Sequence, residues 1–131
     1  MAKLKVAIVE DDEILAKVIT EELKEAGFKV FGAMDGEEGL EVVKSKKPDL
    51  VLLDVMIPKM DGFQVLETMK KSPETQKIPV IMLTMLGGDE DIKKGLKLGA
   101  NDYIVKSQHP VAEICEKVKG FFSKESHPEG K

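Results

Sequence analysis

The chain has 131 residues, which is enough for one domain of ordinary size with a sizeable core. Its composition, 42% hydrophobic and 34% charged, excludes an intrinsically disordered chain. The net charge of −4 argues against direct nucleic-acid binding, and a single cysteine argues against a disulfide framework. The lack of a long apolar run argues against membrane insertion. With no signal-peptide pattern at the start of the sequence, we expect a cytoplasmic protein.

Short apolar runs recur along the chain and predict five strands. Continuous runs of four apolar residues are typical of strands buried on both faces, and they occupy residues 6–9, 50–53 and 80–83. Residues 29–34 and 103–105 are weaker strand candidates. Helical periodicity separates the runs, so strand and helix alternate five times. This order predicts an α/β fold with a doubly wound, five-stranded parallel sheet and five helices on its two faces.

The helical segments show apolar stripes and recognisable ends. The first stripe is Leu15, Val18, Ile19 and Leu23, and the last is Val111, Ile114, Cys115, Val118, Phe121 and Phe122. Gly27 stands where the first helix is expected to stop. Two helix starts carry variants of the capping box, Asp35 with Glu38 and Asp61 with Gln64.

The segment 87–98 is the least secure helix because it contains three glycines, each of which costs about 1 kcal/mol relative to alanine. A soft element at this place is a candidate for movement. The last periodic residue is Phe122. We therefore assign residues 1–122 to one domain and residues 123–131 to a flexible C-terminal tail.

Polar residues gather where the predicted strands end. Ligands of open parallel sheets bind beyond the carboxyl ends of the strands, so these residues should share one rim. Each has an ordinary structural explanation by itself, such as a helix cap, a strand-end hydroxyl or a solvated charge. The prediction depends on the agreement of four strand ends, which supply Glu10, Asp11 and Asp12, then Asp54, then Thr84, then Lys106.

This set of groups suits phosphoryl chemistry on a carboxylate. Crowded carboxylates repel, and a hard divalent cation such as Mg²⁺ removes that cost while taking oxygen ligands. An ionised Asp54 beside the cation can attack phosphorus as a nucleophile. Lys106 and the cation would offset charge on the transferring group, and Thr84 could donate a hydrogen bond to it.

Five motifs in fixed order carry a family resemblance over about residues 3–122. They are Val-Ala-Ile-Val-Glu-Asp-Asp at 6–12, Asp-Leu-Val-Leu-Leu-Asp-Val-Met-Ile-Pro at 49–58, Met-Asp-Gly at 60–62, Ile-Pro-Val-Ile-Met-Leu-Thr at 78–84 and Gly-Ala-Asn-Asp-Tyr-Ile-Val-Lys at 99–106. The sequence resembles the receiver domains of two-component response regulators, including the single-domain chemotaxis regulators. The resemblance implies a flavodoxin-like fold with the strand order 2-1-3-4-5.

The resemblance also implies a role for each site residue. Asp54 would accept a phosphoryl group from a phosphohistidine on a sensor histidine kinase. Thr84 and Lys106 would sense the group, and Tyr103 would rotate inward after Thr84 moves. Mg²⁺ would be bound by Asp11, Asp54 and the carbonyl of Met56, with Glu10 acting mainly through water.

The implied function is a phosphorylation-dependent signalling switch. The chain would catalyse only its own phosphorylation and slow dephosphorylation. Its output would be altered binding of an unknown downstream protein through the fourth helix and fifth strand.

The sequence departs from the family pattern around the site. Ser107 stands where the family has a proline joined by a cis bond, and a cis bond before serine would cost roughly 2.5–4 kcal/mol. Met85 replaces a usually small residue after Thr84. Met56 and Leu86 occupy positions that border the approach of hydrolytic water in the family. Both are large and unable to bind water strongly, which predicts a long-lived phosphorylated state.

Three other functions were weighed against this one. A Mg²⁺-dependent aspartyl-phosphate phosphohydrolase of the haloacid dehalogenase type needs Asp-x-Asp at the nucleophile, and here the second position is Met56. A flavin- or nucleotide-binding module needs a first loop that cradles phosphate, and the acidic residues 10–12 would repel it. A binding scaffold without phosphorylation would not need Asp54, Thr84 and Lys106 together.

Overall fold

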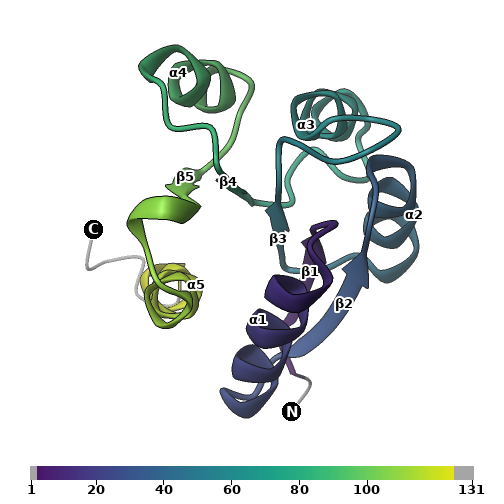
Figure 1. Ribbon diagram of the computed structural model, residues 1–131. Helices are drawn as coiled ribbons and strands as arrows, with labels where there is room; N and C mark the ends of the chain where they lie inside the picture. The colour runs from purple at the N-terminus through teal and green to yellow at the C-terminus, as the bar shows by residue number, and fades with distance from the viewer. Residues whose placement is uncertain (1–2, 126–131) are drawn as a thin grey trace.

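The computed structural model describes residues 3–125 and contains one five-stranded parallel sheet (Figure 1). The strands are β1 (Lys5–Val9), β2 (Lys29–Ala33), β3 (Leu50–Leu53), β4 (Val80–Thr84) and β5 (Asp102–Val105). Their order across the sheet is β2-β1-β3-β4-β5. The predicted fold class and strand order are therefore confirmed.

The helices alternate with the strands and cover both faces of the sheet (Figure 1). They are α1 (Glu13–Glu25), α2 (Gly36–Lys46), α3 (Gly62–Lys71), α4 (Asp89–Lys97) and α5 (Val111–Glu125), with a short 3₁₀ helix η1 (Lys106–Gln108) before α5. No helix in the range 3–125 has the length and apolar character needed to cross a membrane.

The core has two layers because the strand side chains alternate between the sheet faces. One face, which includes Val9, Leu53 and Met82, packs with the buried residues of α2 and α3. The other face, which includes Ile8 and Leu52, packs with those of α1 and α5. The central strands β1, β3 and β4 are almost wholly buried, which explains why they are continuous apolar runs in the sequence.

The two predicted capping boxes differ in the structure. At the start of α3, Asp61 and Gln64 exchange both side-chain hydrogen bonds, so this box is complete. At the start of α2, the Asp35 carboxylate accepts from the Glu38 N–H, but the Glu38 carboxylate accepts from the Met34 N–H instead of from Asp35. Each arrangement pairs N–H groups that would otherwise be left unpaired at the helix N-terminus.

Helix α4 has two features that weaken helices, in line with the glycines of its sequence. Gly88 precedes it without a side-chain cap, and Gly95 lies in its middle against the ring of Tyr103. At the other end of the chain, α5 continues to Glu125, beyond the expected domain boundary at residue 122. Residues 126–131 of the predicted tail lie outside the described residues.

At Gly62, the start of α3 lies very close to the backbone that follows β3, and this close approach can be tested by substitution. A Cβ at this position would clash with the carbonyl oxygen of Asp54 and lie 2.8 Å from the Cα of Val55, and neither backbone atom can move easily. We expect Gly62→Ala to destabilise the protein by about 1–3 kcal/mol in urea denaturation. Gly120→Ala is the matched control, because nothing lies within 4 Å of its added Cβ. It should stabilise α5 by about 0.5–1 kcal/mol. Equal effects of the two changes would contradict this account.

Candidate functional site

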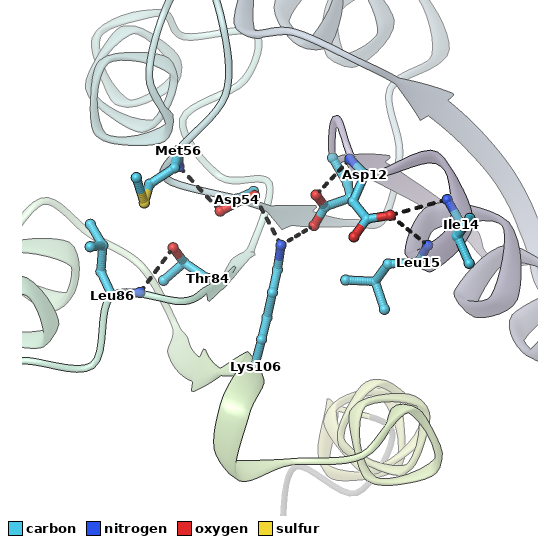
Figure 2. A network of polar contacts seen from close by, with 9 residues as sticks. Asp12, Ile14, Leu15, Asp54, Met56, Thr84, Leu86 and Lys106 are labelled. Atoms are coloured by element: carbon cyan, nitrogen blue, oxygen red, sulfur yellow. Dashed lines mark hydrogen bonds and ion pairs between the residues drawn. The ribbon is translucent and has the colours of Figure 1, made fainter.

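An ammonium group between two carboxylates forms the centre of the site. The Lys106 Nζ atom lies 2.5 Å from Oε1 of Glu10 and 3.0 Å from Oδ2 of Asp54. Glu10 and Asp54 follow β1 and β3 and are buried, with exposed fractions of 1% and 4%. Lys106 directly follows β5, and Figure 2 shows its side chain extending to Asp54. Residues that follow β1, β3 and β5 therefore meet, as the sequence predicted.

Burial and ion pairing shift the pKa values of Glu10 and Lys106 in opposite directions. Burial raises the pKa of Glu10 above its usual value of 4.5, although the ion pair with Lys106 opposes the change. Burial would lower the pKa of Lys106, but its contacts with Glu10 and Asp54 outweigh burial and raise that pKa above 10.5. Lys106 is thus firmly charged at neutral pH and partly balances the acidic cluster.

The adjacent acidic residues divide into two roles. One carboxylate oxygen from each of Glu10, Asp11 and Asp54 lies within 4.8 Å of the others. Such a set of hard oxygen donors fits a divalent cation such as Mg²⁺. Asp12 turns the other way and caps α1, because its carboxylate accepts from the N–H groups of Ile14 and Leu15 (Figure 2). The predicted distinction between Asp11 and Asp12 agrees with this geometry.

The loop after β3 holds the Asp54 carboxylate from its own backbone. The Met56 N–H donates to Oδ1 of Asp54 at 3.1 Å. The loop is closed by a hydrogen bond of 2.8 Å from the Gly62 N–H to the carbonyl of Val55. Asp54 is consequently constrained on both oxygens, by Met56 on one and by Lys106 on the other.

Thr84 and Tyr103 are joined through the backbone of Leu86. The buried Thr84 hydroxyl accepts from the Leu86 N–H at 3.3 Å, and the Tyr103 hydroxyl donates to the Leu86 carbonyl at 2.8 Å. Thr84 keeps its own O–H for donation to another acceptor. Burial, with added repulsion from Asp91 and Asp54, raises the pKa of Tyr103 to about 12. Tyr103 is therefore a neutral donor at neutral pH.

The Lys106–Ser107 bond is trans, and residues 3–125 contain no cis peptide bond. Lys106 begins the 3₁₀ helix η1, whose turn is closed by a hydrogen bond from the His109 N–H to the Lys106 carbonyl. The His109 imidazole contacts the Glu113 carboxylate, with 2.6 Å between Nδ1 and Oε1, and so joins this turn to α5. Lys106 is thus placed in the site with a trans peptide bond and with serine, not proline, directly after it.

Sequence reasoning missed two contacts in the site. It assigned Glu10 to a cation through water, whereas Glu10 makes the shorter of the two contacts with Lys106. It also gave no role to the backbone of Leu86 as a link between Thr84 and Tyr103. The register of the strand ends could have suggested the first contact. No residue type signals the second, because Leu86 takes part in it only through its main-chain N–H and carbonyl groups.

The sequence profile of the response regulator receiver domain matches residues 6–119. A probable transcriptional regulator, ycf27, of Cyanophora paradoxa is 37% identical over 126 residues, which are 96% of this chain and 51% of that protein. The alkaline phosphatase synthesis transcriptional regulatory protein PhoP of Bacillus subtilis is 37% identical over 88% of this chain and 47% of its own length. This chain thus spans about half the length of the curated relatives it matches.

A solved structure gives the same result for the fold. The crystal structure of a response regulator from Chloroflexus aurantiacus superimposes with a TM-score of 0.84 and 31% sequence identity. The match covers 93% of this chain and 99% of that one.

Replacing Lys106 with methionine tests the charge balance of the site. Without the ammonium, Glu10 loses the ion pair that opposes the effect of burial, so the pKa of Glu10 rises further and the folded state binds a proton more readily. A carboxyl group whose pKa is higher in the folded than in the unfolded protein stabilises the folded state only while it is protonated. In the variant this contribution is therefore present at low pH and is lost as the pH rises from the carboxyl pKa of the unfolded protein through the raised pKa of the folded protein. We expect Lys106→Met to lose about 3 kcal/mol near pH 8 and less near pH 5, by urea denaturation.

Lys117→Met is the matched control for Lys106→Met, because Lys117 is an exposed residue whose Nζ lies 3.9 Å from Asp102. Exposed pairs contribute little, so its effect should be small at both pH values. A loss in Lys106→Met that does not change with pH would contradict the proposed rise in the pKa of Glu10.

Proposed function

The chain belongs to the response regulator receiver domain family, and from that membership we propose that it is a phosphorylation switch with Asp54 as its phosphoacceptor. The observation that carries the assignment is the setting of the Asp54 carboxylate. It is buried at the end of β3, contacts an ammonium group at 3.0 Å, and shares a cluster with two further acids.

The proposed chemistry is transfer from a phosphohistidine of a sensor histidine kinase. An oxygen of the Asp54 carboxylate attacks phosphorus, the new O–P bond forms, and the P–N bond to the imidazole breaks. Lys106 is positioned to offset the charge on the phosphoryl oxygens as they arrive. The Met56 N–H orients the nucleophile through its hydrogen bond to Oδ1.

We propose Mg²⁺ as the cofactor of this transfer. Asp11, Asp54 and the main-chain carbonyl of Met56 would bind it, and Glu10 would act through water. When bound, the cation would neutralise charge on the acids and on the transferring group. The exposure of Asp11, in contrast to the burial of Glu10 and Asp54, leaves that carboxylate free to turn toward the cation.

The proposed output uses the link from Thr84 to Tyr103. An acyl phosphate brings about −1.5 to −2 charges to a site whose hydroxyl donor is Thr84. Donation from Thr84 to the phosphoryl oxygens would shift the backbone of Leu86, and Tyr103 would follow because it bonds to the same residue. The surface of α4 and β5 would then favour a different downstream protein partner.

The phosphosite is tested with acetyl phosphate and Mg²⁺. The chain should gain one phosphoryl group that hydroxylamine removes, as measured by intact-mass spectrometry. Asp54→Asn should abolish the gain and keep the folded circular dichroism spectrum, since asparagine preserves the shape of the side chain. Asp35→Asn, a helix-cap carboxylate outside the acidic cluster, is the control and should be phosphorylated normally. Unchanged labelling of Asp54→Asn would refute the assignment.

The metal assignment is tested by comparing two neighbouring aspartates. We expect Asp11→Asn to weaken Mg²⁺ binding by about tenfold or more in isothermal titration calorimetry, because it removes an oxygen donor of the cluster. Asp12→Asn should have a much smaller effect, since asparagine also caps helices. EDTA should stop phosphorylation of the parent chain. A larger loss in Asp12→Asn would overturn this assignment of ligands.

The lifetime of the phosphorylated state is tested at Met56 and Leu86. Neither side chain can hold a water molecule for attack on phosphorus, so the label should persist for many minutes to hours in Mg²⁺ buffer. The double variant Met56→Asn with Leu86→Glu supplies polar groups and should lose its label about fivefold faster or more, the ratio given by about one net hydrogen bond. Loss from the parent within seconds, or no acceleration in the variant, would contradict the shielding.

A further inference from the structure

The two most exposed methionines of the described chain are close in sequence to residues of the candidate phosphosite. The exposed fraction is 58% for Met56 and 59% for Met85, whereas Met69 and Met82 are completely buried. Met34 is exposed by 42% but belongs to the turn after β2, at the edge of the sheet.

These two methionines lie close to the reacting group in the chain. Met56 follows Asp54 by two residues and bonds to its carboxylate through the backbone, and Met85 follows Thr84 directly. Figure 2 shows Met56 and Leu86 on one side of Asp54 and Lys106 on the other. Lys106 contacts Oδ2 of Asp54, whereas Oδ1 faces the Met56 N–H and is therefore the carboxylate oxygen nearer to Met56.

The single cysteine is not a competing target for oxidants. Cys115 is buried in α5, and its burial raises the pKa of the thiol to about 11. Little thiolate therefore exists at neutral pH, and thiolate is the reactive form. Peroxide that reaches this domain will meet the exposed thioethers first.

From this placement we propose that Met56 and Met85 are oxidation sites through which a hydroperoxide shortens the life of the phosphoryl group on Asp54. The proposal rests on the proposed function, because it concerns the phosphorylated state of the same site. It adds a chemical input, peroxide, that the phosphorelay itself does not supply.

The oxidation step is balanced with hydrogen peroxide as the oxidant. The thioether sulfur attacks one peroxide oxygen, an S–O bond forms, the O–O bond breaks, and water leaves. The sulfur loses two electrons to the peroxide and becomes a sulfoxide. Methionine sulfoxide reductases reverse this step with thiol reductants, so the modification can act as a switch.

The sulfoxide changes the environment of the acyl phosphate. A thioether accepts hydrogen bonds weakly, whereas the new oxygen is polar and can hold a water molecule. Beside Asp54, that water is placed to attack phosphorus. The water oxygen forms a new bond to phosphorus, the P–O bond to Asp54 breaks, and a water proton passes to solvent, which releases inorganic phosphate and restores the carboxylate.

The first experiment locates the oxidation without using phosphorylation. The whole chain is treated with dilute hydrogen peroxide, catalase removes the excess, and peptide mass spectrometry follows each methionine. Met56 and Met85 should be oxidised faster than Met34 and long before Met69 and Met82. Equal rates at Met56, Met85 and the buried methionines would overturn the proposal.

The second experiment measures the half-life of the label from acetyl phosphate before and after oxidation. Oxidised parent protein should lose the label about fivefold faster, which corresponds to one modest hydrogen bond to water. Methionine sulfoxide reductase should restore the slower loss. Met56→Leu with Met85→Leu, compared with its own unoxidised sample, should no longer respond, while the control Met34→Leu should respond like the parent. Met56→Gln should hydrolyse faster without oxidant.

The outcomes separate the two proposals. A parent chain that takes no label before oxidation would refute the phosphoacceptor assignment and this inference with it. A normal label whose half-life is the same after oxidation of Met56 and Met85 would refute the oxidation proposal alone. An equal response in the Met56→Leu, Met85→Leu variant would also refute it.

Discussion

The site depends on one ammonium group placed between two buried carboxylates. Lys106 is the charge that lets Glu10 and Asp54 share a nearly dry environment, because an unpaired buried carboxylate would take up a proton or destabilise the fold. The remaining negative charge of the cluster suits a divalent cation. In the proposed switch, the same arrangement would keep the carboxylate nucleophile and the positive charges that assist phosphoryl transfer within one small volume.

The fold supports this arrangement by burying the strands and leaving the loops beyond them exposed. β1, β3 and β4 are packed on both faces, so the positions where they end are rigidly determined. The loops after β3 and β4 carry Met56 and Leu86, which the proposed switch would use. Helix α4 lacks a side-chain cap and contains Gly95 against Tyr103, so we expect it to move more readily than a well-capped helix.

Met56 belongs to both the proposed water shield and the proposed oxidation sites. In the proposed switch, Met56 and Leu86 would restrict the approach of water and prolong an acyl phosphate, while the exposed thioether of Met56 would also be open to peroxide. The same side chain would thus slow hydrolysis and make its rate sensitive to oxidants. The buried thiol of Cys115 leaves that sensitivity to methionine.

The sequence by itself determined which segments form the buried sheet and which residues gather at one rim of it. Apolar runs such as residues 50–53 specify strands buried on both faces, and residues at strand ends must share a rim in a parallel sheet, so Asp54, Thr84 and Lys106 could be placed together. Asp12 could likewise be separated from Asp11, because a carboxylate at a helix start has N–H groups to cap.

Only the tertiary structure decided which atoms meet within that rim. The shorter contact of Lys106 with Glu10 depends on where the loop after β5 directs a long side chain, and the trans bond before Ser107 shows that this loop has its own path. The link from Thr84 to Tyr103 passes through the backbone of Leu86, which carries no signal in the sequence. Periodicity reports which face a residue occupies, whereas distances of a few ångströms depend on loop conformation and packing from segments far apart in the chain.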